Sequence, residues 1–376
     1  MEQKEYMKRA IALAAKAGGF AAPNPLVGAV IVKDGRIIGE GYHRKCGELH
    51  AERNAFASLT ESAKGAQLYV TLEPCCHYGR TPPCTEAIIE HGISEVYIGS
   101  RDPNPLVAGK GAAVLREHGI QVTEDYLREE CDKLNPVFFH YITRKTPYVA
   151  LKYAMTADGK IAAYTGASKW ITGETARAHV QQLRGFYSGV MAGIGTVLAD
   201  DPMLNCRLEN AHQPLRIVLD SCLRIPPESR LCQTAGEYPV LVVCTEAADR
   251  RKAEQLQRLG AEVYVCASEN GRVALPALME ELGRRQISGI LCEGGGSVHE
   301  ALLRSGTANH VYAYIAPKLL GGKDAKTPVE GQGADCPDHA AVLTNRHVTL
   351  LGEDILLEYD IERGFADVHG DHRGDR

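Results

Sequence analysis

Residues 50–84 have the sequence HAERNAFASLTESAKGAQLYVTLEPCCHYGRTPPC, and the first half of the chain is built around this stretch. It contains His50, Cys75 and Cys84, one imidazole and two thiols, which form the soft ligand set that zinc prefers. Three protein ligands leave the fourth tetrahedral position open for water, which distinguishes a catalytic zinc from a structural one. Glu52 lies two residues after His50, where its carboxylate could move protons for that water without binding the metal.

An H-x-E tripeptide followed by P-C and a further cysteine is typical of zinc-dependent deaminases. The spacing differs in one respect, because Cys75 and Cys84 are nine positions apart rather than three. We therefore expect residues 76–83 to form a loop that returns Cys84 to the metal and can also contact substrate. The alternative is a structural zinc with Cys76 or His77 as its fourth ligand, but such a site has no need for a neighbouring carboxylate.

The composition bounds the class of protein. The 376 residues suffice for two domains, and the net charge of -5 argues against a nucleic-acid partner, since phosphate binding requires a concentrated basic surface. The sequence shows no apolar signal region and no stretch of membrane-spanning length, so we expect no membrane association. Its twelve cysteines are scattered, and we expect reduced thiols in the cytoplasm apart from the metal ligands.

The first half alternates helical and strand patterns. Helices are expected at 5–16, 48–58, 85–91, 112–118 and 124–144, and strands at 27–32, 36–41, 68–72, 95–98 and 120. The last helix is expected to break at Asn135-Pro136. This alternation predicts a three-layer α/β/α sandwich over residues 1–145, with the metal between two helix N-termini whose positive ends favour thiolates.

The second half begins with an apolar strand at Tyr148, and we place the domain boundary near residue 145. Strands are expected at 148–155, 188–194, 215–220, 240–245, 262–266 and 289–293, and helices at 174–184, 247–259, 275–284 and 298–303. Parallel strands joined by crossover helices predict a doubly wound α/β domain over residues 146–363, with ligands at the carboxyl ends of its strands. Residues 364–376 are polar and are expected to form a disordered tail.

Two stretches of the second half carry groups suited to a dinucleotide. Residues 289–297, GILCEGGGS, run from a strand through glycines into a helix, where bare backbone amides can bind a pyrophosphate. Residues 193–207, GIGTVLADDPMLNCR, place a threonine, two aspartates and an arginine after small residues. Lys152, Arg184 and Arg207 are cations that could hold a phosphate. Taken singly, the first stretch is equally consistent with a tight turn and the second with a capped turn, and each cation alone is better explained as a solvated charge.

Together the motifs closely resemble those of the bifunctional deaminase–reductase family of riboflavin biosynthesis, across roughly residues 1–360. In the first half they are PNPLVG (23–28), HAE (50–52), EPCCHYGRTPPC (73–84) and RDPNP (101–105). In the second half they are KYAMTADGK (152–160), SKWIT (168–172), GIGTV (193–197), DDPML (200–204) and EGGG (293–296). The resemblance implies a cytidine-deaminase-like N-terminal domain and a C-terminal domain similar to dihydrofolate reductase.

The same resemblance implies two reactions on one small molecule. The first removes the 2-amino group of a diaminopyrimidinone that carries a phosphoribosylamino arm, giving an aminouracil. The second is an NADPH-dependent reduction of the ribosyl group to ribityl. One zinc per chain and NADPH are the cofactors implied, and the preference for NADPH over NADH rests on the resemblance alone.

The residue roles follow the matching positions. Zinc would bind His50, Cys75 and Cys84, and Glu52 would carry protons from the water to the ring nitrogen and the leaving ammonia. The resemblance assigns the deaminase substrate to Asn24, His43, His77 and Arg80. It assigns the reductase substrate to Lys152, Ser168, Arg184, Leu204, Arg207 and Glu293. It assigns NADPH to Ala154, Trp170, Thr172, Thr196, Asp200, Ser221, Gly294, Gly295 and Gly296. The proton donor of the reduction is left between Lys152 and Asp200.

Two other functions compete with this interpretation. One is a deaminase of a free base, a nucleoside or tRNA with a non-catalytic second half, although 6% aromatic residues and a negative net charge do not suit tRNA. The other is a binding protein stapled by zinc. The sequence leaves the oligomeric state open, including a homo-oligomer.

Overall fold

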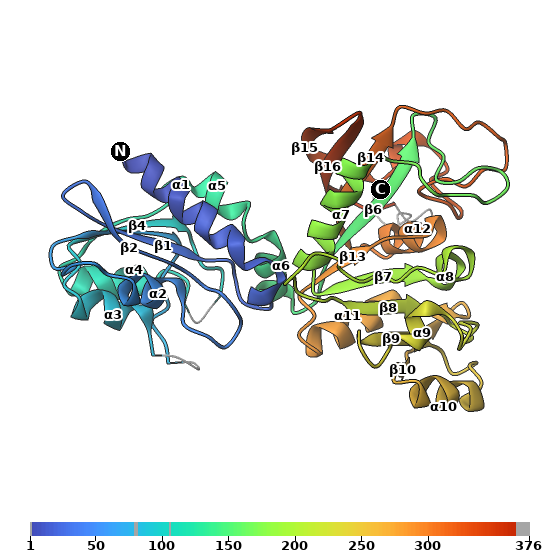
Figure 1. Cartoon of the computed structure of the whole chain (residues 1–376), viewed down its shortest axis with the longest axis horizontal. Coiled ribbons are helices and arrows are strands. Elements are labelled where there is room, and N and C mark those ends of the chain that lie inside the picture. Colours follow the sequence, from blue (N-terminus) through green and yellow to red (C-terminus); the bar gives the residue numbers. More distant parts are fainter. Residues whose placement is uncertain (1, 79–81, 105–106, 366–376) are drawn as a thin grey trace, which may run out of the picture. The chain divides into compact units, whose positions relative to one another are not determined.

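The computed structural model describes residues 2–78, 82–104 and 107–365. The chain divides into two compact units, Met1–Lys145 and Thr146–Arg376, and each unit contains its own sheet (Figure 1). Among the described residues no helix is both long and apolar enough to span a membrane.

The first unit contains a five-stranded sheet in the order β2-β1-β3-β4-β5. Its strands are β1 (Gly28–Lys33), β2 (Arg36–Tyr42), β3 (Gln67–Leu72), β4 (Glu95–Ser100) and β5 (Gln121–Thr123). β1 runs antiparallel to β2 and β3, and β3, β4 and β5 are parallel. The β1–β2 hairpin turns at Asp34-Gly35, where both residues adopt the left-handed backbone that a two-residue hairpin loop requires.

Helices cover both faces of this sheet. One face packs against α1 (Gln3–Ala14) and α5 (Arg128–Asp132), through residues such as Val30 and Tyr69. The other face, with Ile31 and Val70, packs against α2 (Ala51–Ala57), α3 (Cys84–Glu90) and α4 (Lys110–Glu117) (Figure 1). The two sets of strand residues alternate because successive side chains point to opposite faces. The predicted three-layer sandwich is therefore confirmed.

One expected helix differs in detail, and one expected break is confirmed. The first helix continues beyond Ala14 as a 3-10 segment, η1 (Ala15–Ala21), in which Gly18 adopts a left-handed backbone. The helix expected at 124–144 is broken before Pro136, as predicted, into α5 and α6 (Pro136–Arg144), because proline can begin a helix but not continue one. Between them the Asn135 side chain binds both the N–H and the carbonyl of Leu26, at 2.7 and 2.9 Å.

The second unit contains a nine-stranded sheet in the order β10-β9-β8-β7-β13-β6-β14-β16-β15. Its strands are β6 (Tyr148–Thr156), β7 (Gly189–Gly193), β8 (Leu215–Leu219), β9 (Val240–Cys244), β10 (Glu262–Val265), β13 (Gly289–Cys292), β14 (Ala308–Ala316), β15 (Val342–Leu351) and β16 (Asp354–Arg363). Its helices are α7 (Glu174–Phe186), α8 (Ile194–Asp200), α9 (Arg230–Gln233), α10 (Arg250–Arg258), α11 (Leu275–Arg284) and α12 (Gly296–Arg304). A separate small hairpin pairs β11 (Ser268–Glu269) with β12 (Arg272–Val273).

The parallel part of this sheet matches the expected doubly wound pattern, whereas its last three strands were not foreseen. β14 adds to β6 in parallel, and β16 and β15 then add as an antiparallel edge. β15 exposes most of its side chains, so its sequence lacks the buried run or regular alternation that indicates a strand. β7 and β9 are buried along their whole length, as expected for strands covered on both faces.

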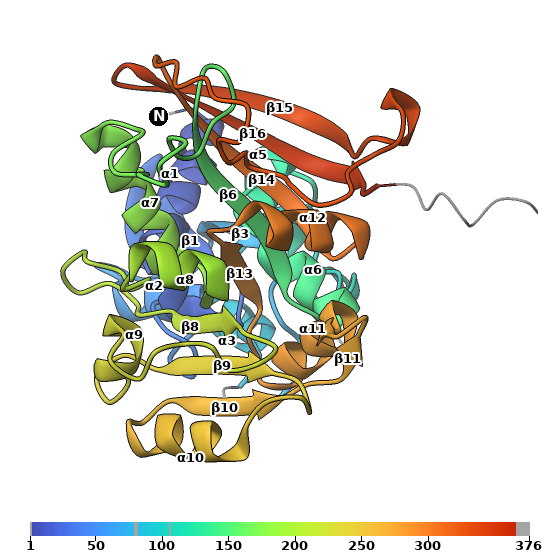
Figure 2. The same cartoon turned by 90° about the vertical axis from the view of Figure 1, so that its right-hand side faces the viewer.

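The strand order places the carboxyl ends of four strands next to one another. The chain moves outward from β7 to β10 and then returns to insert β13 between β7 and β6 (Figure 2). In an open α/β sheet such a reversal is where ligands bind. Among the residues assigned to the reductase site, Glu293 and Gly294–Gly296 directly follow β13, Ser221 follows β8, and Thr196 lies on the helix that follows β7.

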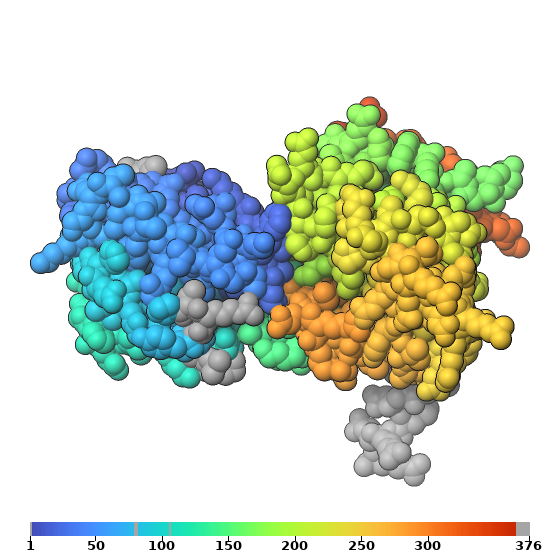
Figure 3. Space-filling model, turned by 60° about the horizontal axis from the view of Figure 1, so that its bottom comes forward, coloured from blue at the N-terminus to red at the C-terminus, as the bar shows by residue number. Residues whose placement is uncertain are grey.

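The β10 edge of this sheet, opposite the β15 edge, lies beside a polar helix, α10. On α10 only Leu256 is fully buried, and the gold and yellow segments around α9 and α10 form much of the visible surface of the second unit in Figure 3.

The polar tail was expected to begin at residue 364, but the described chain continues to Phe365, whose ring lies 5.5 Å from the Arg304 guanidinium. Residues 366–376 lie outside the described part.

Candidate active sites

Three separate segments of the first unit bring the proposed zinc ligands together. His50 is the residue before α2, Cys75 follows β3 after Glu73-Pro74, and Cys84 is the first residue of α3. The His50 Nδ1 atom lies 3.5 Å from Cys75 Sγ and 3.4 Å from Cys84 Sγ. A tetrahedral zinc with ordinary Zn–N and Zn–S bonds holds such atoms about 3.6 Å apart. Both nitrogen–sulfur distances therefore agree with the spacing around a tetrahedral zinc, and the two sulfurs lie within 4.8 Å of each other.

The backbone at the start of α3 favours the thiolate form of Cys75. The Cys84 backbone N–H donates to Cys75 Sγ at 3.3 Å. Hydrogen bonding from the Cys84 thiol, and then from His50, lowers the pKa of Cys75 to about 4, whereas the pKa of Cys84 is raised by sharing its proton with Cys75 and by burial. Without metal the pair therefore holds one thiolate and one thiol. A metal ion bound by both sulfurs would take the place of the proton that they share.

Neither proposed fourth ligand belongs to this group. Among the described residues, the ligating atoms that lie within 4.8 Å of one another here come from His50, Cys75 and Cys84, and not from Cys76 or His77. One other such group, Asp335, Cys336 and His339, comes from a single short turn at the surface. A three-ligand site with an open position fits a catalytic zinc better than a closed structural one.

Glu52 lies in the first turn of α2 and is only 3% exposed. Burial raises the pKa of its carboxyl group, with the charge of Cys75 adding to the effect. A carboxyl group whose pKa is moved toward neutrality can both accept and release a proton at working pH. Its position beside, but outside, the three-ligand group agrees with the expected separation of roles.

Asn24 and His43 are also brought to this site. The His43 ring packs edge-on to His50 with centroids 5.5 Å apart, and its Nδ1 faces the Leu49 carbonyl at 3.1 Å. Burial lowers the pKa of His43, so the neutral ring donates from Nδ1 and its Nε2 accepts from Asn24 Nδ2 at 3.1 Å. His77 has a buried Nδ1 with no partner among the described residues, and Arg80 lies outside them.

The structure adds two carboxylates that the sequence did not single out. Glu73 is 5% exposed and caps α4, since its oxygens accept from the N–H groups of Gly109 at 2.9 Å and Ala112 at 3.2 Å. This explains the acidic residue before Pro74-Cys75. Asp102 is 8% exposed, and burial raises its pKa to about 6.

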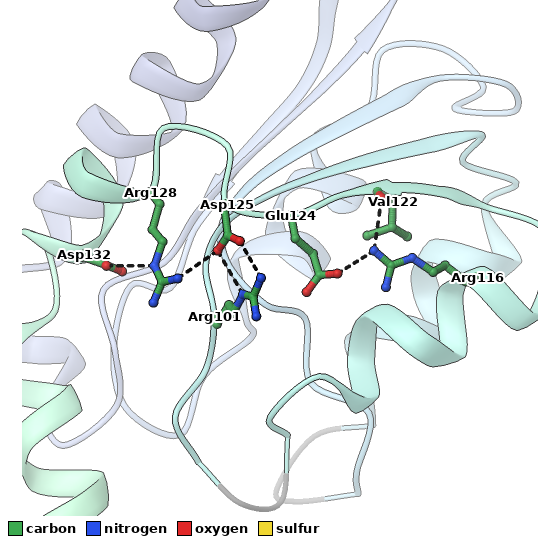
Figure 4. A network of polar contacts seen from close by, with 7 residues as sticks. All are labelled: Arg101, Arg116, Val122, Glu124, Asp125, Arg128 and Asp132. Carbon is green, nitrogen blue, oxygen red and sulfur yellow. Dashed lines mark hydrogen bonds and ion pairs between the residues drawn. The ribbon is translucent and has the colours of Figure 1, made fainter.

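The loop that carries Asp102 is anchored from its other side. Arg101 binds Asp125 through two hydrogen bonds of 3.0 and 2.5 Å, and Arg128 binds both Asp125 and Asp132 (Figure 4). This network is exposed, so its contribution to stability is small. Its geometric effect is to hold the chain after β4 while Asp102 turns inward.

A buried charge cluster occupies the second unit at the ends of β6 and β13. Glu293 accepts from Arg184 Nε at 2.5 Å and from Arg184 Nη2 at 3.0 Å, and Lys152 Nζ lies 3.8 Å away. Burial opposes the charge of Glu293, but Arg184 and Lys152 outweigh it and lower the pKa of that carboxyl group. Burial also lowers the pKa of Lys152. Arg184 further donates to the Asn205 carbonyl at 3.0 Å, which fixes the chain beside Leu204 and Arg207.

The glycine loop, Gly294–Gly296, lies against the end of β7 and the start of α8, and we call this arrangement the glycine cradle. The Gly193 N–H donates to the Gly294 carbonyl at 3.0 Å, and a Cβ on Gly294 or Gly295 would lie 3.3 to 3.4 Å from Thr196 Oγ1. At Gly294 the backbone is also left-handed, so only glycine fits without strain. Bare amides and a threonine hydroxyl are groups that suit a pyrophosphate.

The other residues assigned to the reductase site lie on several elements of this unit. Ser168 Oγ donates to Asp200 Oδ1 at 2.8 Å, and the exposed Trp170 stacks under Arg177 at 4.7 Å. Lys318 donates to the carbonyls of Trp170 and Ile171, which holds the loop that leads to Thr172. Ala154 shares the Lys152 face of β6. Ser221 lies further along, after β8, where its hydroxyl accepts from the Val273 N–H at 3.3 Å.

Each half of the chain matches a known protein family. A model of the cytidine and deoxycytidylate deaminase zinc-binding region matches residues 1–100, and a model of the RibD C-terminal domain matches residues 147–357. The riboflavin biosynthesis protein RibD of Actinobacillus pleuropneumoniae is 57% identical over 359 residues, covering 96% of this chain and 95% of the relative. The RibD protein of Escherichia coli strain K12 is 39% identical, with coverages of 95% and 99%.

Solved structures show the same two-domain fold. Acinetobacter baumannii RibD, form 1, superposes with a TM-score of 0.84 at 37% identity and covers 96% of this chain and 99% of its own. A diaminohydroxyphosphoribosylaminopyrimidine deaminase/5-amino-6-(5-phosphoribosylamino)uracil reductase from Thermotoga maritima gives 0.82 at 40% identity, with coverages of 95% and 98%. The chain therefore belongs to the RibD family of riboflavin biosynthesis, bifunctional enzymes that join a zinc-dependent deaminase domain to an NADPH-dependent reductase domain.

Proposed function

We propose that this chain deaminates 2,5-diamino-6-(5-phosphoribosylamino)pyrimidin-4(3H)-one and then reduces the ribosyl group of the resulting aminouracil to ribityl. The observation that carries the first step is the spacing of His50, Cys75 and Cys84 beside the buried Glu52. The second step rests on the buried Lys152–Glu293–Arg184 cluster next to the glycine cradle.

In the deaminase site His50, Cys75 and Cys84 would hold the zinc. When bound, that ion supplies the Lewis acidity that makes a water molecule nucleophilic near neutral pH. Glu52 then takes a proton from the water, passes it to the ring nitrogen and later supplies one to the departing amine, so water replaces ammonia at the ring carbon. Asn24, His43, His77 and Arg80 are proposed to hold the pyrimidine and its arm.

Asn24 and His43 have a defined polarity for this task. Because His43 is neutral and accepts from the Asn24 amide, the side chain of Asn24 is fixed in one orientation. A fixed amide can distinguish donor from acceptor positions on a pyrimidine edge. The pair therefore suits recognition of the ring rather than the phosphate.

In the reductase site NADPH, when bound, supplies two electrons and one hydrogen to the sugar. We assign its binding to Ala154, Trp170, Thr172, Thr196, Asp200, Ser221 and Gly294–Gly296. Substrate is assigned to Lys152, Ser168, Arg184, Leu204, Arg207 and Glu293. The sugar ring must open, and its oxygen requires a proton as the carbon–oxygen bond breaks.

Between the two candidate donors of that proton, the contacts favour Lys152. Asp200 Oδ1 accepts a hydrogen bond from the Ser168 hydroxyl, so this oxygen is already engaged with another side chain. Lys152 is an ammonium group at the buried end of the cluster, with Glu293 3.8 Å away to balance its charge. Its lowered pKa makes proton release easier than from a solvated lysine.

One incubation tests both reactions. The zinc-loaded enzyme is given the diaminopyrimidinone phosphate with or without NADPH, and the products are followed by mass spectrometry. We expect a gain of about 1 Da without NADPH, when an amino group is exchanged for a hydroxyl group or its keto tautomer, and a further gain of about 2 Da with NADPH, when two hydrogens are added. These masses follow from the atoms exchanged, as in other zinc deaminases. An unchanged substrate would refute the proposal, whereas a stop after the first mass change would leave the second unit without its assigned activity.

Two further statements concern the setting of the protein. All twelve cysteines lie in the described residues and are free of disulfides, which supports a reducing compartment, and we propose the cytoplasm. The ligand of both sites is a small molecule, and we retain a homo-oligomer as an assembly to be tested by light scattering.

A further inference from the structure

Lys152 depends on a carboxylate that it must share. Its side chain is 15% exposed, and its nearest anionic partner is Glu293, whose two oxygens already accept from Arg184. The separation of 3.8 Å from Glu293 is too long for a hydrogen bond, so this ion pair alone does not fix the ammonium group. Another group must define its position.

The Tyr314 ring is that group. β14 pairs in parallel with β6, and Lys152 Nζ lies 5.7 Å from the centre of the Tyr314 ring. A cation within about 6 Å of an aromatic face is attracted by the ring, and the attraction increases when the pair is removed from water. Tyr314 is 1% exposed, so the contact is shielded.

His179 fixes the ring in turn. Its Nδ1 lies 2.7 Å from the Tyr314 hydroxyl, and it belongs to α7, the helix that also carries Arg184. Burial lowers the pKa of His179 and raises the pKa of Tyr314, so at neutral pH the hydroxyl keeps its hydrogen and donates it to the imidazole. One helix thus holds both the arginine that binds Glu293 and the histidine that orients the tyrosine.

We propose that Tyr314 and His179 are positioning residues of the reductase site, in which the Tyr314 ring holds the Lys152 ammonium group against Glu293 and His179 keeps that ring in place. The inference rests on the proposed role of Lys152 as the proton donor. Neither residue was among those assigned to substrate or NADPH.

The charges that act on Lys152 come from four elements. Glu293 after β13 and the Tyr314 ring on β14 stabilise the ammonium form, whereas Arg184 on α7 opposes it, as would a protonated His299 on α12. Loss of the ring therefore removes one of two favourable contacts. We expect a loss of about tenfold in the proton affinity of Lys152, which is about one unit of pH.

The test uses the full-length, zinc-loaded protein with NADPH and the deaminated intermediate. Tyr314→Leu should lower the reductase kcat about tenfold and move the alkaline limb of its pH profile about one unit lower, since the donor must be protonated. Tyr314→Phe keeps the ring and His179→Gln releases it, and each should lower kcat about twofold to threefold with a smaller shift of the limb. Deaminase activity should be unchanged in all three, because it reports on the other unit.

Four results would overturn the inference. The first is a Tyr314→Leu enzyme with the wild-type kcat and alkaline limb. The second is an equal loss in the Leu and Phe variants with no movement of the limb, which would mean that the side chain only fills space. The Leu variant is uninformative if it no longer binds NADPH, and the Tyr314→Phe and His179→Gln variants then provide the test. Wild-type kinetics in both of them is the third result. The fourth is full reductase activity in Lys152→Met. It would show that Lys152 is not the proton donor and would remove the inference with it.

Discussion

Replacing Glu52 with glutamine tests the central chemical assignment of the first unit. Glutamine has nearly the same shape, so the 3% exposed position in α2 is filled without a new cavity. The zinc ligands are unchanged, and we expect one zinc per chain as in the wild type. The variant loses only the ability to accept and release a proton.

The size of the effect follows from the number of proton transfers. A positioned acid or base contributes a factor of about 10² to 10⁴ to the rate. Glu52 is assigned both the transfer to the ring nitrogen and the transfer to the amine, and among the described residues that form this site no other carboxyl group lies on α2 beside His50. We therefore expect the upper end of the range, a loss of about 10⁴ in kcat, which corresponds to about 5 kcal/mol of transition-state stabilisation.

The assay compares both activities of one preparation. Deamination is followed by ammonia release, zinc by elemental analysis, and reduction by NADPH oxidation with the deaminated intermediate. Retained zinc, retained reduction and lost deamination support the assignment. Deamination within tenfold of the wild type would refute the reasoning, and loss of zinc together with activity would make Glu52 a structural residue instead. Glu48→Gln, an exposed change near the same helix, is the matched control.

Three further predictions follow from buried contacts. Glu293→Gln should destabilise the second unit by about 3–5 kcal/mol, because Arg184 remains buried without its counter-charge, and calorimetry should show a lower unfolding temperature with reduction lost. Gly111→Ala should cost about 1–3 kcal/mol and weaken zinc binding, since its Cβ would lie 2.1 Å from the Pro74 carbonyl oxygen. The folded-state pKa of Asp102, raised to about 6 from an ordinary 3.8, penalises folding as pH rises through that window. Asp102→Asn should therefore stabilise the protein by about 3 kcal/mol at pH 8 and by almost nothing near pH 4, as measured by urea unfolding at both values.

The clustering of His50, Cys75 and Cys84 could be predicted because these residue types suggest zinc ligands. Imidazole, thiols and a nearby carboxylate have few other reasons to occur together, and the strand before Glu73 and the helix after Pro83 are strong local patterns. Cys84 still lies beside His50 and Cys75 despite the longer spacing, since Cys84 begins a helix packed on the same sheet.

Other features depend on contacts that sequence patterns do not encode. The capping of α4 by Glu73 joins residues 36 or more positions apart, and no local signal marks it. The Tyr314–His179 contact spans 135 positions and arises only because β14 adds to β6. β14 and the antiparallel edge were themselves missed, because β15 is largely exposed and lacks regular alternation. Contacts of this kind depend on the order of strands in the sheet, which local sequence patterns do not specify.

The two sites set the charge of a buried glutamate in opposite directions, and this difference matches their proposed roles. Burial, with the charge of Cys75, raises the pKa of the Glu52 carboxyl group and leaves it able to exchange protons. Glu293 is equally enclosed, but Arg184 and Lys152 lower the pKa of its carboxyl group and keep it an anion. A fixed anion cannot act as an acid, but it can hold a neighbouring ammonium group that does. The proton is therefore expected to come from the carboxyl group in the first site and from the lysine in the second.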